Sequence, residues 1–245
     1  TSGTPTGMAK IPGGEFMAGL DPSIGYRECN KYLTSVGCKQ EWFTNEGPEH
    51  MVLIDTFYMD KYEVTQGEYE RAMGSNPSHF KGASLPVEIV SWHDADAYCK
   101  KVGKRLPTEA EWEKAAKGGR DTVYPWGNEI DGSKANFCDA NCEFDWKRSD
   151  FDDGHAKTAP VGSYRPNGYG LYDMAGNVWE WVADWYDGDY YRTASRNNPR
   201  GPSSGTYKVL RGGSWVNSPD NLRSANRTGN DPSRQLNNIG FRCAQ

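Results

Sequence analysis

The residues of this chain that could do chemistry are chiefly six cysteines and one pair of closely spaced acids. The cysteines stand at positions 29, 38, 99, 138, 142 and 243. Their even number favours disulfide bonds in an exported protein, and the alternatives are a zinc site or buried free thiols. Cys138 and Cys142 form a C-x3-C pair, but no second pair follows at zinc-finger spacing. We therefore expect disulfides rather than a metal.

The acid pair is Glu180 and Asp184, which could share a helical face and act as general acid and base. Carboxylates at this spacing are more often solvated or bound to a cation, so we do not assign catalysis to them. The neighbouring Trp179, Trp181 and Trp185 could stack on sugars, but such a cluster more often belongs to a core. We expect these tryptophans to be core residues.

A third candidate is the polar stretch "RGGSWVNSPDNLRSANR", from Arg211 to Arg227, with its continuation to Asn238. Asparagine offers both a donor and an acceptor, and arginine offers a planar fork of donors. Polar, adaptable loops on a rigid frame suit recognition of another molecule, whereas the alternative is a loop whose asparagines only satisfy backbone groups. The candidate ligand-binding residues are Ser214, Trp215, Asn217, Asn221, Arg223, Asn226, Arg227, Asn230, Arg234 and Asn237.

Three segments that must position these residues predict helices. Thr65 and Thr108 each begin a capping box, and Gly74 and Gly118 provide the stops. Ser91 can begin a third helix. Short apolar segments such as "MVLIDTFYMD" and "YKVLRGG" predict strands. Residues 118–170 show mostly loop character, which is far longer than an ordinary connection and needs support other than strand pairing.

Composition limits the kind of protein. The 245 residues include 9 Trp, 14 Tyr and 8 Phe, together with 28 Gly and 14 Pro, which predicts a coil-rich fold held by aromatic side chains. A net charge of -5 with scattered positive residues argues against nucleic acid. The apolar runs are too short to span a bilayer. We expect residues 1–8 to be a flexible lead or linker, and residues 9–245 to be a single domain.

Several motifs, taken in order, cover residues 11–244 and resemble one known family. They are "IPGGEFMAG", "YEVTQGEYERAMG", "PVEIVSWHDADAYCKKVGKRLPTEAEWEKAAKGG", "YPWGNE", "TAPVGSYRPNGYGLYDMAGNVWEWVADWY", "LRGGSW" and "NIGFRCA". Together they resemble the formylglycine-generating enzyme, or sulfatase-modifying factor, family. The resemblance implies an α+β fold with high irregular content, which is the modified C-type-lectin-like fold of formylglycine-generating enzymes.

The resemblance does not carry over the family's copper site. Family enzymes oxidise a sulfatase cysteine with copper held by two cysteines shortly after the "GGS" motif, because soft thiolates select Cu(I). Here Ser214 matches the family serine, but Asn217 falls at the first cysteine position, and residues 214–242 contain no cysteine. An amide cannot supply a thiolate. We therefore expect neither copper nor formylglycine formation.

The resemblance also implies one disulfide. The cysteine of "GFRCA", Cys243, is a structural partner in the family, and the same mapping gives Cys99 as its mate. A loop of this length is worth roughly 4–5 kcal/mol in chain-entropy terms. Proximity alone then pairs Cys29 with Cys38 and Cys138 with Cys142.

Two structural calcium sites are implied by the same resemblance. The first would use the side chains of Asn136 and Asp153 with the backbone carbonyls of Phe137 and His155. The second would use Asp173 and Glu180 with the carbonyls of Gly176 and Val178. Mixed sets of carboxylate, amide and carbonyl oxygens suit calcium. The alternative is that these acids only bind local backbone amides.

The sequence thus predicts an exported, bacterial, calcium-stabilised binding domain that contacts a protein, peptide or glycan through its C-terminal loop surface. The end of the chain also resembles the variable ends of target-binding proteins made by diversity-generating retroelements, with "GGSW", "RSA" and "GFR" around its asparagines. The alternative function is a maturation enzyme or oxidase that acts on a peptide or secreted metabolite in the same cleft.

Overall fold

The computed structural model describes residues 3–33 and 37–245. Its helices are α1 (Pro22–Tyr32), α2 (Gln66–Met73), α3 (Trp92–Lys101) and α4 (Glu109–Lys117), with short 3-10 helices at Gln40–Glu46, Tyr190–Arg192 and Pro219–Leu222. Its strands are β1 (Met8–Ile11), β2 (Gly14–Ala18), β3 (His50–Ile54), β4 (Phe57–Asp60), β5 (Trp179–Trp185), β6 (Lys208–Arg211), β7 (Arg227–Asn230) and β8 (Ile239–Gly240). None of the helices in these two ranges is long and apolar enough to cross a membrane.

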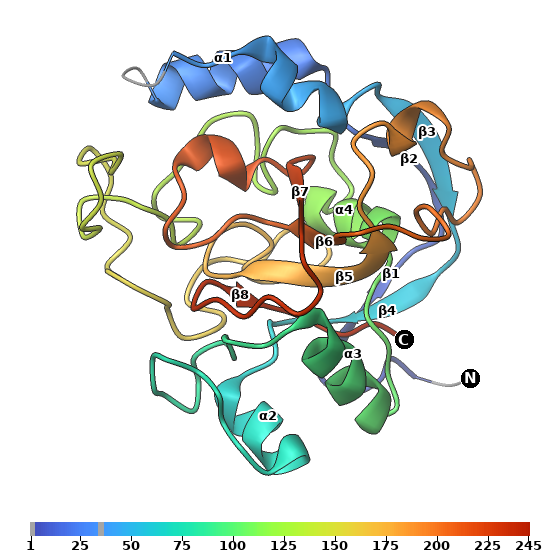
Figure 1. The fold of residues 1–245 in the computed structure, drawn as a ribbon, viewed down its shortest axis with the longest axis vertical. Coiled ribbons are helices and arrows are strands. Elements are labelled where there is room, and N and C mark those ends of the chain that lie inside the picture. The colour runs from blue at the N-terminus through green and yellow to red at the C-terminus, as the bar shows by residue number, and fades with distance from the viewer. Residues whose placement is uncertain (1–2, 34–36) are drawn as a thin grey trace.

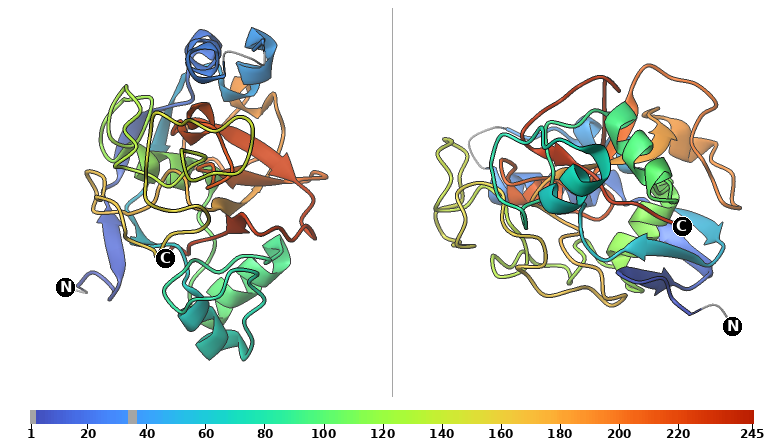
Figure 2. Two further views of the ribbon diagram at one scale, coloured as in Figure 1. Left: turned by 90° about the vertical axis from the view of Figure 1, so that its left-hand side faces the viewer. Right: turned by 90° about the horizontal axis from the view of Figure 1, so that it is seen from below.

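The described strands form three small sheets. β1 pairs with β4 and β2 with β3, both antiparallel, and a third sheet has the order β7-β6-β5-β8. In that third sheet β8 runs parallel to β5, so the end of the chain returns beside the middle of the domain. Figures 1 and 2 show α1 at one end of the long axis and α2 with α3 at the other, with the third sheet between them.

The three helices predicted from caps are confirmed. Thr65, Ser91 and Thr108 each accept a hydrogen bond from the backbone amide three residues on, and each of the three capping boxes is complete. Gly74 and Gly118 adopt left-handed φ values of 84° and 59° at the ends of α2 and α4, a conformation that costs glycine little. Residues 118–170 are almost entirely loop, as expected.

Strand β5 corrects the expectation of a shared helical face. Glu180 and Asp184 lie in an extended segment, where residues four apart are separated by about 13 Å along the strand. Glu180 binds the guanidinium of Arg242, whereas Asp184 accepts the backbone amide of Glu109. The two carboxylates therefore belong to separate networks and cannot act as one acid–base pair.

The core has two main clusters on either side of β5 and β6. One surrounds Trp112 of α4 and the other surrounds Trp181 of β5, both fully buried. Trp179 is buried too, while Trp185 is half-buried beneath the Lys208 ammonium at 3.9 Å. The tryptophans of β5 therefore serve mainly as core residues.

The disulfides join the pairs that the sequence suggested. They link Cys99 to Cys243, Cys29 to Cys38 and Cys138 to Cys142. Cys243 lies three residues after the end of β8, and the next residue, Ala244, forms two backbone hydrogen bonds with Arg105. The polar segment before β8 is therefore fixed at its far end by a strand, a covalent bond and a bridge to the chain after α3.

Candidate functional site

The C-terminal segment, residues 212–238, begins with a forced turn after β6. Gly212 and Gly213 have φ values of 96° and 74°, in the left-handed region. A side chain on Gly213 would lie 2.9 Å from the Asn221 carbonyl oxygen, so no larger residue fits there without movement. The turn directs Ser214 into the interior, where it is fully buried.

Ser214 and Asn217, which the family resemblance would place at a copper site, form a closed polar network. The Ser214 hydroxyl donates to Asn217 Oδ1 at 2.6 Å and accepts from Asn238 Nδ2 at 3.2 Å. Amide and hydroxyl oxygens are hard ligands, whereas Cu(I) selects soft sulfur. The residues at this position therefore do not fit a Cu(I) centre.

Trp215 connects this network to an aromatic patch that includes Phe144 and Trp146. Its indole is buried and donates to the Asn237 carbonyl at 3.2 Å, and the Lys157 ammonium lies 4.9 Å from its ring centroid. Phe144 and Trp146 stack on each other at 4.7 Å, and Trp146 donates to the Val216 carbonyl. Trp146 remains 43% exposed, so it offers a surface beside Asn217 that sequence reasoning missed.

Two of the candidate arginines are structural. Arg223 forms a buried ion pair with Glu46, and Arg227 binds both carboxylate oxygens of Glu109 at 2.7 and 2.8 Å. Their side chains are anchored on the 3-10 helix at Gln40–Glu46 and on α4. Buried charges need such partners, and Arg supplies them with a two-pronged geometry.

The candidate ligand-binding residues therefore divide into two sets. Five are buried and support the segment from inside: Ser214, Trp215, Arg223, Asn226 and Arg227. Five are exposed or half-buried: Asn217, Asn221, Asn230, Arg234 and Asn237. The second set is the part of the prediction that can contact a ligand directly, because the first set shows almost no surface.

A groove of about 380 Å³ lies between this segment and the region that follows α1. Trp42 lines it with a ring that is 49% exposed, and Asn221 lies on the other side. Asn45 also lines it, and its Oδ1 is buried without a hydrogen-bond partner. Asn226 braces this wall by donating to the Asn221 carbonyl at 2.7 Å. The groove thus offers an aromatic face beside the half-buried amide of Asn221.

The residues expected at the first calcium site have the donors that calcium needs. Asn136 is buried, and its amide nitrogen donates to the Lys157 carbonyl at 2.8 Å while its Oδ1 has no partner. Asp153 accepts the backbone amides of Phe137 and His155 at 2.9 and 2.8 Å. Burial, with Asp139 nearby, raises the pKa of Asp153 to about 7. An unpaired oxygen beside an uncompensated carboxylate fits a hard cation.

The second expected site carries an excess of buried negative charge. Asp173 accepts the Gly162 amide at 2.6 Å, and Glu180 is held by Arg242. Glu63, which sequence reasoning missed, lies in the same cluster. Burial and the carboxylates of Asp173 and Glu180 raise the pKa of Glu63, and burial raises the pKa of Asp173 to about 6. Three acids beside one guanidinium leave an excess of negative charge here, and Arg242 already binds Glu180.

Gly176 and Val178, the other two residues expected at the second calcium site, form hydrogen bonds within the protein through their backbone amides. Gly176 donates to the Gly212 carbonyl at 2.9 Å, and Val178 donates to the Glu63 carboxylate at 3.2 Å. Across the described residues, no three His, Cys, Asp or Glu side chains gather in a metal-binding arrangement. A metal at either place would therefore depend on amide and carbonyl oxygens as well as carboxylates.

Asn177 joins these regions to the C-terminal segment. Its amide donates to Glu63 at 2.6 Å, and its Oδ1 accepts from Asn136 at 3.2 Å. Its own carbonyl accepts the backbone amide of Trp215 at 2.9 Å. One residue thus contacts both acidic regions and the segment that carries the candidate surface.

Together, these elements define a C-type-lectin-like domain of the formylglycine-generating-enzyme type. The chain belongs to the family described as the sulfatase-modifying factor enzyme 1-like domain, which matches residues 1–245. The fold predicted from the motifs is therefore confirmed.

Two relatives and one solved structure illustrate the range of this family. The chain is 34% identical to the formylglycine-generating enzyme of Bos taurus, over 98% of this chain and 75% of that protein. It is 36% identical to the serine/threonine-protein kinase pkn1 of Chlamydia pneumoniae over 98% of this chain, but spans only 38% of that protein. The structure of Treponema denticola variable protein 1 is 29% identical, with a TM-score of 0.77 over 97% of this chain and 94% of that one.

Proposed function

We propose that this domain is an exported binding module, whose C-terminal segment contacts a protein, peptide or glycan. The observation that carries the proposal is the hydrogen-bonded network of Ser214, Asn217 and Asn238, which takes the place of a sulfur-bound copper. The adjoining groove supplies both an apolar surface and hydrogen-bonding groups for recognition. Trp42 offers an apolar face, and the half-buried amide of Asn221 offers hydrogen bonds that match a peptide backbone or sugar hydroxyls.

Calcium is part of the proposal, as a structural ion. In the first site it would bind Asn136, Asp153 and the carbonyls of Phe137 and His155, and in the second it would bind Asp173, Glu180 and the carbonyls of Gly176 and Val178. The link through Asn177 supports a role for both ions in holding the C-terminal segment. Export is supported by the disulfides, which persist in oxidising compartments.

The similarity to a variable protein supports a further part of the proposal, that this segment is a site of sequence diversification. Such diversification would require a frame that does not depend on the exposed side chains. The buried ion pairs of Arg223 and Arg227 provide that frame independently of Asn217, Asn221, Asn230 and Asn237. A near-copy of the segment beside a reverse-transcriptase gene would be the expected genomic context.

The catalytic alternative is tested with the copper-loaded protein and a cysteine-containing sulfatase-type peptide. We expect mass spectrometry to show no aldehyde product, with the Bos taurus relative as the positive control. Formation of the aldehyde by this protein would overturn the proposal.

Binding is tested on an array of peptides and glycans probed with the labelled full chain. We expect the double variant Trp42→Ala, Asn221→Ala to give a signal at least about tenfold weaker than that of the wild type on the peptides or glycans that the wild type binds. Both side chains line the groove. Lys101→Ala, an exposed change on α3, is the matched control and should bind like the wild type. Equal binding by all three proteins would contradict a role for this groove.

A further inference from the structure

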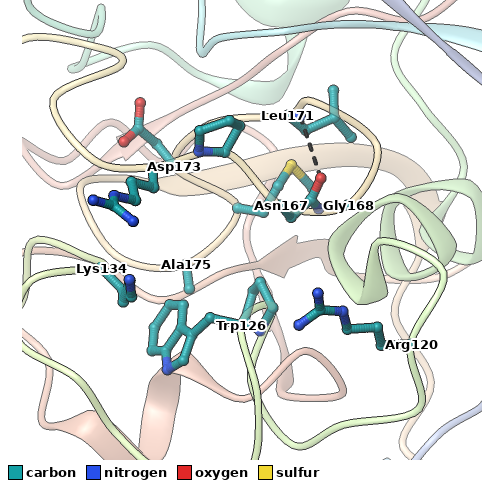
Figure 3. A pocket seen from close by; sticks show the side chains of 12 residues that line it. Arg120, Trp126, Lys134, Asn167, Gly168, Leu171, Asp173 and Ala175 are labelled. Atoms are coloured by element: carbon teal, nitrogen blue, oxygen red, sulfur yellow. Dashed lines mark hydrogen bonds between the residues drawn. The ribbon is translucent and has the colours of Figure 1, made fainter.

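A second cavity, of about 280 Å³, lies where the chain after α4 meets the loop around residues 165–175 (Figure 3). None of its lining residues belongs to the C-terminal segment or to its groove. Three of them are cationic, namely Arg120, Lys134 and Arg165, and one is acidic, Asp173. This local excess of positive charge is notable in a chain whose net charge is -5.

The three cations are not neutralised by the protein. Within residues 3–33 and 37–245, neither the Arg120 nor the Arg165 guanidinium makes a hydrogen bond or an ion pair, and both residues are exposed. Lys134 has one acidic neighbour, Asp131 at 3.8 Å, which is beyond hydrogen-bond distance. An ion pair of that kind on the surface contributes little, so all three charges are available to a ligand.

The acid in the lining does not cancel them. The Asp173 carboxylate accepts the Gly162 amide at 2.6 Å and faces the buried Arg242. In Figure 3 its oxygens point away from Trp126 and Lys134. The side of the cavity that holds Trp126 is therefore dominated by positive charge.

Trp126 gives the cavity a rigid aromatic wall. Its ring stacks on the buried Tyr124 with centroids 5.5 Å apart and planes 7° apart, and its indole N–H donates to the Glu129 carbonyl at 2.8 Å. These contacts fix the ring and leave its remaining surface to the cavity. Figure 3 shows Lys134 and Arg120 on either side of it. A ligand ring stacked on Trp126 would thus have cations at both edges.

We propose that this cavity binds a single acidic sugar, a pyranose ring that carries a carboxylate or a sulfate. The anionic group would bind Arg120, Lys134 or Arg165, and the apolar face of the ring would stack on Trp126. The volume suits one ring rather than an oligosaccharide. The site is independent of the proposed binding through the C-terminal segment, and either can fail without the other.

The test is calorimetric titration of the full chain at low salt with glucuronate and glucose 6-sulfate, the two sources of the anion. Glucose, inorganic sulfate and benzoate are the comparison ligands. We expect at least one acidic sugar to bind about tenfold or more tightly than glucose and than sulfate alone, and to weaken as salt is added. Binding of glucose as tightly as the acidic sugars would overturn the proposal, as would no binding by either of them. Tighter binding of sulfate or benzoate than of both acidic sugars would also overturn it.

Variants locate the site. Arg120→Gln combined with Arg165→Gln removes two exposed guanidinium groups that bind no side chain or carbonyl within residues 3–33 and 37–245, so the fold should be unaffected. We expect this double variant to bind the acidic sugar about tenfold more weakly than the wild type. Arg71→Gln, an exposed arginine on α2, is the matched control and should leave binding unchanged. Wild-type affinity in the double variant would place the sugar elsewhere and overturn the assignment.

Discussion

Glu88 shows how a single buried acid couples this fold to pH. It is fully buried, and its Oε1 accepts the Phe80 amide at 2.8 Å, whereas its Oε2 has no hydrogen-bond partner in the described part of the chain. Burial raises the pKa of its carboxyl to about 7, from a usual value of 4.5. A carboxyl whose pKa is higher in the folded state binds protons more tightly there, so it destabilises the fold once the pH rises above the unfolded value.

We therefore predict that the free energy of unfolding falls between pH 4.5 and pH 7 on account of Glu88 and changes little from this source above pH 7. The shift corresponds to about 3 kcal/mol at most. Glu88→Gln keeps the acceptor for Phe80 and removes the titration, so its advantage over the wild type should grow across that range. Urea unfolding at pH 5 and pH 8 measures the difference. Parallel pH profiles for the two proteins would refute the assignment.

Individual residues of the C-terminal segment differ in how far their roles can be predicted from the sequence. Asn217 could be recognised at the copper position because its neighbours in "LRGGSW" fix the alignment. Arg223 and Arg227 could not be recognised as buried, because their partners Glu46 and Glu109 are far away in the sequence. Polar composition alone does not distinguish an anchored arginine from an exposed one. Trp42 and Asn45 could not be recognised as groove residues either, because the residues that face them across the groove, such as Asn221, lie far away in the sequence.

Among the elements, those with local signals were the predictable ones. α2, α3 and α4 carry complete capping boxes, which need only the residues within one turn. α1 begins at Pro22 after the cap residue Asp21, but its few apolar residues gave no periodicity to detect. β5 is a central strand that is buried along most of its length. The spacing of its acids is also compatible with one face of a helix, and its pairing with Arg211 of β6 and Ile239 of β8 cannot be predicted from local sequence.

The disulfide between Cys99 and Cys243, which fixes the end of the C-terminal segment, should contribute more to stability than the shorter disulfides. Cys99 and Cys243 are separated by 144 residues, whereas Cys138 and Cys142 are separated by only 4. Because the entropy that a cross-link removes from the unfolded chain grows with loop length, replacing both Cys99 and Cys243 by Ser should cost about 5 kcal/mol, against about 2 kcal/mol for the short pair. Thermal unfolding of the two double variants measures this. Equal losses, or a larger loss for the short pair, would show that native-state contacts dominate.

At the scale of the whole molecule, the long loop between α4 and β5 is the part that most needs support. It is almost without strands, and both proposed calcium sites are built from it and from the start of β5. The motifs identified this region as a whole, but not the buried Glu63 or the linking residue Asn177, whose partners come from distant segments.

We predict that calcium stabilises the protein and that chelation reverses the effect. At a concentration about 100 times the dissociation constant, one ion contributes about 2.7 kcal/mol, which raises the melting temperature by roughly 5–10 °C in a chain of this size. Asn136→Ala should reduce the calcium response, because it removes the unpaired Oδ1. Asn128→Ala, an exposed asparagine in the same loop and outside both expected ligand sets, is the control. No calcium response in the wild type would remove calcium from the proposal.

The clamped ends of the C-terminal segment also decide how this protein can be altered. One end is held by the buried pair of Arg211 and Glu113, and the other by β8 and the bond between Cys99 and Cys243. Between these ends, we expect substitutions to be tolerated only at the positions that are not buried, because Ser214, Trp215, Arg223, Asn226 and Arg227 support the segment from inside. We therefore expect a library randomised only at the half-buried Asn221, Asn230 and Asn237 to retain folding in most of its clones while sampling new specificities.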